Sequence, residues 1–277
     1  MPGVLEDCLL DTRPIGVFDS GLGGLTAVKE LERLIPNENI IYFGDTGRVP
    51  YGTRGINTIK KYAVSDMRFL LSFNVKAIII ACGTVSSIAI DEVRRITDLP
   101  VIGVVEPTAK TAVEVSKTGK IGVIATSATI SSGSFQKAIS KLNPDAEVIA
   151  RACPLFVPLV ENGYFGRDCK LAQLAAHDYI DEFKGRIDTL ILGCTHYPLL
   201  RGVIEDILPG VILVDSGFET AKTAVSLLSE QDLLNTSGKG SVHYYVSDQT
   251  SDFERLAGIF LEHPVNGMVD TVDIEKY

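Results

Sequence analysis

The chain has 277 residues, of which 45% are hydrophobic and 22% are charged, and its formal net charge is −9. This composition is typical of a globular protein, and the length suits two domains of ordinary size or one large one. The acidic balance, with no long basic run, argues against nucleic acid as a partner. No apolar stretch approaches the roughly 20 residues that cross a bilayer, and the N-terminus lacks the basic start of a signal peptide. We therefore expect a cytoplasmic protein with reduced cysteines and no membrane partner.

Apolar, β-branched runs alternate with amphipathic segments along most of the chain. The first part of the pattern predicts strands at 14–18, 40–43, 75–81 and 101–105, and helices at 25–35, 58–73 and 86–96. The pattern then restarts, with strands at 119–125, 147–150, 187–193 and 211–214 and helices at 134–142, 169–183 and 198–207. A linker-like stretch at 234–240, a strand at 243–246 and a helix at 251–261 come last. This alternation predicts an α/β fold with mostly parallel sheets flanked by helices.

A weak internal repeat divides the chain into two similar halves. Asp19-Ser20-Gly21 resembles Asp215-Ser216-Gly217, and each half contains a predicted strand that ends in a cysteine. We interpret the repeat as two similar α/β units that face each other across a cleft. Clefts between units are common sites for small ligands, so we expect the active site there.

Cys82 and Cys194 are the best candidates for chemistry, because each follows one of these strands. Open α/β sheets place their functional groups at the carboxyl ends of strands. A duplicated thiol suits a reaction with two faces, with one acid/base group on each side of a flat intermediate. We expect a nearby helix N-terminus to lower the pKa of each thiol below its ordinary value of about 8.5, which already suits acid/base work.

Other uses of these cysteines stay open. Either thiol could be a small core residue. Cys82, Cys194 and His196 could bind zinc, although no Cys-x-x-Cys or His-x-x-x-His pair supports a metal site. Cys194 and His196 could form the nucleophile and base of a hydrolase, which would leave Cys82 without a role. A non-catalytic amino-acid-binding protein is a further alternative. The remaining cysteines are expected to be structural: Cys8, Cys153 and Cys169.

Several polar side chains near predicted strand ends are further candidates, each with an ordinary structural explanation. Asp19 could cap a helix or assist a catalytic thiol. The glycine-rich turn that follows it matches neither the dinucleotide nor the Walker pattern, so a nucleotide is not implied. Glu161 could be a solvated loop acid. Thr126 and Thr129 could cap a helix or bind a carboxylate, and His196 is the only histidine beside a candidate thiol.

Five short motifs form a specific combination between about Ile15 and Val246. They are Asp19-Ser20-Gly-x-Gly-Gly, Gly44-Asp45-Thr46, Pro50-Tyr51-Gly52, Ala81-Cys82-x-Thr84 and Gly193-Cys194-Thr195-His196-Tyr197-Pro198. Together they resemble the glutamate racemase family, within the aspartate/glutamate racemase superfamily. The resemblance implies racemisation of glutamate without cofactor or metal, supplying D-glutamate for bacterial peptidoglycan. It also implies two domains, the first comprising 1–105 and 215–277 and the second 106–214.

The resemblance further implies residue roles. Cys82 and Cys194 would be the two bases, with Cys82 acting on D-glutamate and Cys194 on L-glutamate. Asp19 would assist Cys82, while His196 and Glu161 would assist Cys194. The residues implied to bind substrate are Ser20, Pro50, Tyr51, Gly52, Gly83, Thr84, Thr126, Thr129 and Thr195. A racemase of a related substrate, such as aspartate, stays open.

Gly83 departs from the family pattern, which usually has Asn between the first cysteine and the threonine. The change removes a side-chain amide that the family is expected to place against the substrate. We expect it to alter affinity and, to a lesser degree, substrate choice, and to leave the reaction type alone. For the assembly we expect a homodimer, which no residue pattern in the chain specifies.

Overall fold

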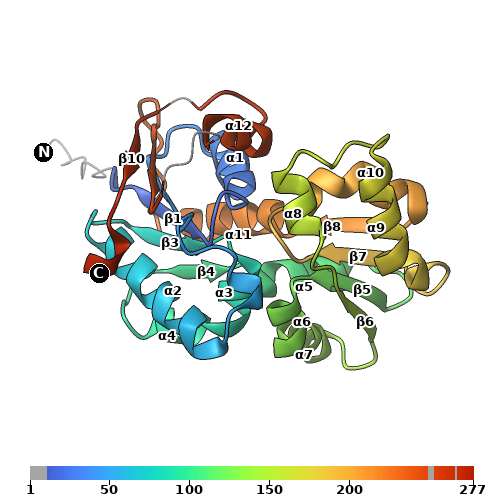
Figure 1. Ribbon diagram of the computed structural model, residues 1–277. Helices are drawn as coiled ribbons and strands as arrows, with labels where there is room; N and C mark the ends of the chain where they lie inside the picture. Colours follow the sequence, from blue (N-terminus) through green and yellow to red (C-terminus); the bar gives the residue numbers. More distant parts are fainter. Residues whose placement is uncertain (1–10, 249–252, 266) are drawn as a thin grey trace, which may run out of the picture.

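The computed structural model describes residues 11–248, 253–265 and 267–277. The chain folds into two lobes that lie side by side, each built around its own sheet (Figure 1). All neighbouring strands in both sheets run parallel. Parallel strands need long crossover connections, which most of the helices supply. The structure confirms the predicted α/β class, with two parallel sheets flanked by helices.

The first lobe, which we call the six-stranded unit, has the strand order β10-β9-β2-β1-β3-β4. Its strands are β1 (Ile15–Asp19), β2 (Ile40–Gly44), β3 (Ala77–Ile80), β4 (Val101–Gly103), β9 (Val242–Val246) and β10 (Val269–Thr271). Its helices are α1 (Leu25–Leu34), η1 (Tyr51–Thr53), α2 (Ile56–Leu71), α3 (Gly83–Ile88), α4 (Ile90–Arg94), α12 (Phe253–Leu261) and η4 (Ile274–Lys276). The central strand β1 lies between β2 and β3, with Ile15 opposite both Ile40 and Ala77.

The second lobe, the four-stranded unit, has the strand order β6-β5-β7-β8. Its strands are β5 (Lys120–Ala125), β6 (Glu147–Ala152), β7 (Thr189–Leu192) and β8 (Ile212–Asp215). Its helices are α5 (Val105–Val115), α6 (Ser127–Ser132), α7 (Ser134–Leu142), α8 (Phe156–Glu161), α9 (Lys170–Ile180), η2 (Asp181–Phe183), η3 (Tyr197–Leu200) and α10 (Arg201–Ile207). The loops that follow β5 and β7 face the six-stranded unit and carry the residues of the site described below.

Both faces of the six-stranded sheet are buried. Val17 of β1 and Ile79 of β3 belong to one hydrophobic cluster, while their chain neighbours Phe18 and Ile80 belong to another. Successive side chains of a strand point to opposite faces, so the two clusters lie on opposite sides of the sheet. This double burial explains why these strands read as continuous apolar runs.

Helix α11 (Ser216–Glu230) leads the chain from the second sheet back to the first. The Asp215 side chain caps it by accepting hydrogen bonds from the backbone N–H groups of Gly217 and Phe218, at 2.8 and 3.2 Å. The helix packs against α1 of one unit and α5 of the other. Strand β9 then pairs with β2, with Val242 opposite Ile40. A late segment of the chain therefore completes a sheet that begins near its start.

A buried ion pair fastens the stretch between α11 and β9. The Lys76 ammonium lies 2.6 Å from the Glu38 carboxylate, and both side chains are fully buried. Lys76 also donates to the Leu233 carbonyl at 2.7 Å, and Glu38 accepts from the Asn235 N–H at 2.7 Å. Much of the linker-like stretch predicted at 234–240 is thus tied to the six-stranded sheet.

The predicted elements differ from the structure in a few places. The single helix expected at 86–96 is two short helices, α3 and α4, because the backbone of Ala89 leaves the helical region with φ of −123°. The strand expected at 101–105 ends at Gly103, and Val105 begins α5. Residues 251 and 252 of the late helix lie outside the described residues. The helices that the prediction omitted are α5, α6, α8 and α11.

Among the residues that the structure describes, no helix combines the length and the apolar character needed to cross a membrane.

Candidate active site

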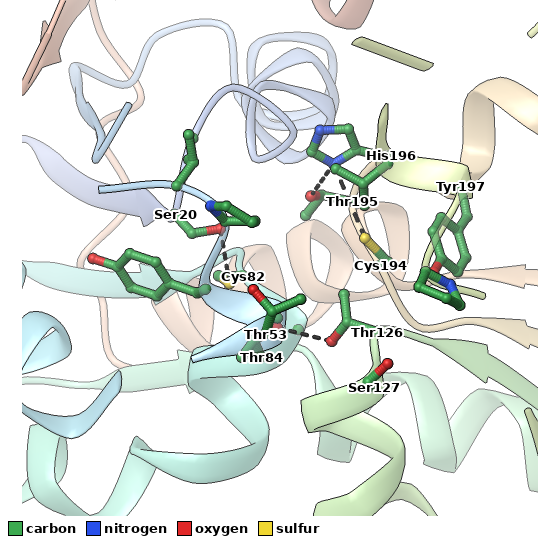
Figure 2. A pocket seen from close by; sticks show the side chains of 18 of the residues that line it. Ser20, Thr53, Cys82, Thr84, Thr126, Ser127, Cys194, Thr195, His196 and Tyr197 are labelled. Atoms are coloured by element: carbon green, nitrogen blue, oxygen red, sulfur yellow. Dashed lines mark hydrogen bonds between the residues drawn. The ribbon is translucent and has the colours of Figure 1, made fainter. Parts of the chain in front are cut away.

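A cavity of about 430 Å³ lies where the carboxyl ends of the two sheets face each other. The six-stranded unit contributes the loops after β1, β2 and β3, and the four-stranded unit contributes the loops after β5, β6 and β7 together with α8. The predicted site residues that line it are Ser20, Pro50, Tyr51, Gly52, Cys82, Gly83, Thr84, Thr126, Glu161, Cys194, Thr195 and His196. Figure 2 shows Cys82 and Cys194 on opposite sides of this pocket.

Cys82 lies between the end of β3 and the start of α3, and it is 4% exposed. Its Sγ donates to the Ser20 hydroxyl at 3.4 Å. Asp19, at the end of β1, is buried near it and accepts the Gly21 N–H at 3.0 Å. Within the described residues, the second carboxylate oxygen of Asp19 has no hydrogen-bond partner. The first thiol therefore has a hydroxyl and a buried carboxyl group as its polar neighbours.

The surroundings of Cys82 favour the protonated thiol. Burial and the charge of Asp19 raise the pKa of Cys82 to about 12, although hydrogen bonds to the sulfur act in the other direction. The sequence-based expectation of a lowered pKa is wrong for this cysteine. A helix of six residues has a weak N-terminal field, and desolvation of the thiolate outweighs it.

Cys194 follows β7 and has a different set of neighbours. Its Sγ lies 4.0 Å from Nδ1 of His196, and Nε2 of the same ring lies 3.0 Å from the Glu161 carboxylate. The Thr195 hydroxyl is 3.3 Å from Nδ1. Cys194, His196 and Glu161 thus form a chain from the pocket to its rim, because the Glu161 side chain is 39% exposed.

His196 is positively charged at neutral pH. Burial alone lowers its pKa, but hydrogen bonds with Cys194 and Glu161 and the charges of both groups raise it to about 10. The ring also meets the edge of Phe260 from α12, with ring centroids 5.1 Å apart. The His196 ring, held by the Glu161 carboxylate, is thus the polar neighbour of Cys194 on this side of the pocket.

Hydroxyl groups connect the two units on another side of the pocket. Thr84 Oγ1 lies 3.0 Å from Thr126 Oγ1, and Thr126 in turn donates to Thr129 at 3.0 Å. Thr126 also caps α6 by accepting the Thr129 N–H. A Cβ atom on Gly52 would lie 2.8 Å from the Thr126 side chain, so the Pro50–Gly52 turn reaches across the cleft.

The residues next to the two thiols touch each other. A Cβ atom on Gly83 would lie 2.3 Å from the backbone carbonyl oxygen of Gly193. Gly83 follows Cys82 and Gly193 precedes Cys194, so this contact joins the two thiol-bearing loops through their backbones. The side chain of a larger residue at 83 has no room unless the loops separate.

The structure places some of these residues apart from the cavity, and it adds others to its lining. Asp19 and Thr129 do not line the cavity and instead lie behind Cys82 and Thr126. Cys153, expected to be structural, is buried but lines the pocket. Cys169 is half-buried at the start of α9, and Cys8 lies outside the described residues. The lining residues that the sequence reasoning omitted are Gly21, Val49, Thr53, Ser127, Cys153, Pro154, Val157, Pro158, Gly193 and Tyr197.

Gly21, Gly193 and Tyr197 belong to the motifs quoted above, so the sequence did indicate their position. Thr53 and Ser127 directly follow predicted site residues, so their position could have indicated them. Val157 and Pro158 come from α8, a helix that the prediction did not include. In the ranges given above, no group of three or more His, Cys, Asp or Glu side chains could hold a metal ion.

Comparison with known proteins places this arrangement in a family. A family model described as Asp/Glu/Hydantoin racemase matches residues 15–224. The chain belongs to this racemase family. It is 46% identical over 252 residues to a glutamate racemase of Geobacter metallireducens. The matched segment covers 90% of this chain and 93% of the relative.

Solved structures agree with this result. Glutamate racemase of Francisella tularensis, in complex with D-glutamate, matches with a TM-score of 0.91 and 42% identity, over 97% of this chain and all of the other. Glutamate racemase of Thermus thermophilus, in complex with β-chloro-D-alanine, matches with a TM-score of 0.87 and 42% identity over the same shares. The fold and the family are therefore shown together, and the protein is a racemase.

Proposed function

We propose that this protein interconverts L- and D-glutamate without a cofactor, using Cys82 and Cys194 as the two bases. The observation that carries the proposal is the convergence of the two thiols, one from each sheet, on a single cavity between the units. A racemase must remove a proton from one face of the α-carbon and return one to the other face. The similarity to glutamate racemases across 90% of the chain supports glutamate as the substrate.

The different neighbours of the two thiols support the direction of the first step. Cys194 lies beside the His196 cation, so it acts as the thiolate that removes the α-proton of L-glutamate. Cys82, whose pKa is raised to about 12, holds a proton for the opposite face. After the reaction Cys82 is the thiolate and Cys194 carries the proton. The reverse reaction starts from that state and acts on D-glutamate.

The α-proton of an amino acid is very weakly acidic, so the pocket must stabilise the charge that develops on the carboxylate. We assign this role to hydroxyl and N–H groups that line the pocket, among them those of Ser20, Thr84, Thr126 and Thr195. Thr129 holds Thr126 in place through their hydrogen bond. The Pro50–Gly52 turn closes the pocket around the substrate. Asp19 maintains the proton on Cys82 through its negative charge.

The two units act as domains in this proposal, with 1–105 and 215–277 forming the first and 106–214 the second. Each domain supplies one base, so substrate binding holds the cleft closed. The product, D-glutamate, would serve bacterial peptidoglycan synthesis, a pathway that starts in the cytoplasm.

The test is incubation of the purified protein with L-glutamate in D₂O, without added cofactor. Optical activity and deuterium at the α-carbon are followed together, with L-aspartate as the matched substrate. Loss of optical activity with α-deuteration of glutamate alone is the expected result. Reaction of aspartate in preference to glutamate would overturn the substrate, and no exchange in either would overturn the two-thiol reaction.

A further inference from the structure

A cluster of buried charged groups lies behind the Pro50–Gly52 turn, and no step of the proposed reaction uses it. Its members are Asp45, Arg48, Tyr51 and Asp66, which we call the carboxylate cluster. Asp45 belongs to the Gly44-Asp45-Thr46 motif, to which the reaction assigns no role. Asp66 lies on α2 and belongs to none of the motifs recognised in the sequence.

Arg48 and Tyr51 each contact both carboxylates. Arg48 donates from Nε to Asp45 at 2.6 Å and from Nη2 to Asp66 at 2.8 Å. The Tyr51 hydroxyl lies 3.0 Å from Asp66 and also bonds to Asp45. The Ser247 hydroxyl donates to the other oxygen of Asp45 at 2.7 Å. Arg48, two residues before the turn, and Tyr51, at its centre, are therefore held by the same two carboxyl groups.

The number of hydrogen-bond donors that face Asp45 and Asp66 indicates how many protons the carboxylate cluster holds. Two carboxyl groups that are fully buried face one guanidinium group, and the Glu275 carboxylate 3.4 Å from Arg48 is mostly exposed. The Tyr51 hydroxyl has a single proton, yet it contacts both carboxyl groups. Both contacts are satisfied when Asp66 carries a proton. Burial and the charge of Asp45 raise the pKa of Asp66, which agrees with this count.

Buried charges of this kind are weak evidence for stability, because their desolvation offsets most of their attraction. Their fixed geometry is the stronger reason to expect a role. The turn that they hold lines the pocket with Pro50, Tyr51 and Gly52, whereas Asp45, Arg48 and Asp66 lie outside the lining. Gly52 contacts Thr126 of the other unit, so a shift of the turn changes the width of the cleft.

We propose that Asp45, Arg48 and Asp66 are positioning residues, which hold the Pro50–Gly52 turn at the place where it binds substrate and meets Thr126. Asp66 acts through Arg48 and Tyr51 and does not touch the substrate. The substrate in this proposal is the one given under the proposed function. The position of the turn is a property of the protein alone and is tested without substrate.

The experiment compares Asp66→Leu with Asp66→Asn. Leucine has a similar size and removes all hydrogen bonds, whereas asparagine accepts from Arg48 and donates to Tyr51 as a protonated Asp66 does. Glu38→Gln is the matched control, because it alters the buried Lys76–Glu38 pair in the same unit, remote from the pocket lining. KM and kcat are measured with both enantiomers of glutamate, and amide hydrogen exchange is measured for the peptide that contains residues 49–53.

In Asp66→Leu we expect faster exchange at 49–53 and a KM about 10-fold higher, with kcat changed less than KM, because a buried partner is lost behind the turn. Asp66→Asn should retain near-normal KM and exchange. Glu38→Gln should leave both unchanged, even if it unfolds at a lower temperature. Arg48→Lys, which removes the planar fork of donors that Arg48 directs at the two carboxyl groups, replaces Asp66→Leu if that variant does not fold.

Unchanged exchange at 49–53 in both Asp66→Leu and Arg48→Lys would overturn the positioning role, whatever the substrate is. Equal changes in Asp66→Leu and Glu38→Gln would also overturn it, since they would indicate a general loss of stability. The two proposals can also fail separately. If the wild type does not racemise glutamate but Asp66→Leu still shows faster exchange at 49–53, the positioning role is supported and the proposed function is rejected.

Discussion

The two thiol sites share a local structure and differ in their electrostatics. Each cysteine follows a central parallel strand and precedes a short helical segment. Burial and the charge of Asp19 raise the free energy of the Cys82 thiolate, and the hydrogen bond with the Ser20 hydroxyl offsets this only in part. Cys194 has a histidine cation that is held by a carboxylate at the rim of the pocket. The strand and turn place each sulfur, and the side chains around the two sulfur atoms differ.

In the proposed reaction, this difference supplies one proton donor and one base in the same cavity. In that proposal the neighbours of each sulfur prepare the two roles before the substrate binds. Three changes test the comparison, beginning with removal of either thiol.

Cys82→Ala and Cys194→Ala should each lower racemisation by at least about 10²–10⁴-fold, because one face of the α-carbon loses its acid/base group. The remaining thiol can still remove and return a proton on its own face. In D₂O, we expect Cys82→Ala to exchange the α-proton of L-glutamate for deuterium with retention of configuration at the α-carbon. We expect Cys194→Ala to exchange the α-proton of D-glutamate in the same way. Proton NMR of each enantiomer measures both effects.

Full racemisation by either variant would exclude the two-thiol reaction. Exchange of the opposite enantiomer would reverse the assignment of the two faces while leaving the reaction intact. Circular dichroism of the variants serves as the control for folding.

Gly83→Ala tests whether the contact with Gly193 sets the spacing of the thiols. The new Cβ atom would meet a backbone oxygen, which cannot move aside as a side chain can. Separation of the loops by about 1 Å should lower kcat/KM by about 10²-fold, because proton transfer depends strongly on position. The primary isotope effect at the α-carbon should increase, since proton transfer becomes more rate-limiting.

Gly166→Ala is the matched control, because a Cβ atom there meets nothing within 4 Å. Near-normal kcat/KM in both variants would show that the Gly83 loop can relax without changing the site. Gly83→Asn asks in addition whether an amide at this position compensates for the lost spacing.

His196→Asn removes the cation beside Cys194 and should lower kcat/KM by about 10-fold, within the range of a single charge-assisted hydrogen bond. The equilibrium constant of a racemisation is one, so kcat/KM must fall equally for both enantiomers. Primary isotope effects separate the faces, and we expect the larger increase with α-deuterated L-glutamate. An equal increase for both enantiomers would contradict the assignment of His196 to the Cys194 face.

The pH dependence of stability and of kcat/KM in the wild-type protein should reveal the ionisation of His196. The folded pKa of His196, about 10, lies above its ordinary value of 6.5. Protonation of the ring therefore stabilises the fold fully below pH 6.5, and this contribution is lost as the pH rises through about 10. kcat/KM should decline over the same upper range. Glu161→Gln should move the decline to lower pH, and His196→Asn should lack it.

Much of the fold and the position of the thiols could be predicted from the sequence. Parallel strands buried on both faces leave long apolar runs, and the residue at the end of each run reaches the edge where the chemistry occurs. Cys82 and Cys194 were identified in this way. The helices α5 and α11 were omitted from the prediction.

The remaining features depend on contacts between distant segments. The pKa of Cys82 was predicted in the wrong direction because its burial arises from the packing of two units. Asp66 on α2 gave no signal, since a lone acid on a helix is normally solvated. Phe260 reaches His196 only after the chain has returned to the first unit. Neither the periodicity of apolar residues nor the spacing of motifs in the sequence indicates which distant segments lie close together.

The pairing of β9 with β2 has a consequence for synthesis of the chain. Until β9 is made, β2 is an edge strand of the first sheet, with its backbone groups unpaired on one side. Roughly 200 residues separate the two strands, so at about 5–20 residues per second this edge waits roughly 10–40 s on the ribosome. The whole four-stranded sheet emerges in that interval. The nascent chain thus presents a completed second unit beside a first unit whose open edge is a site for aggregation.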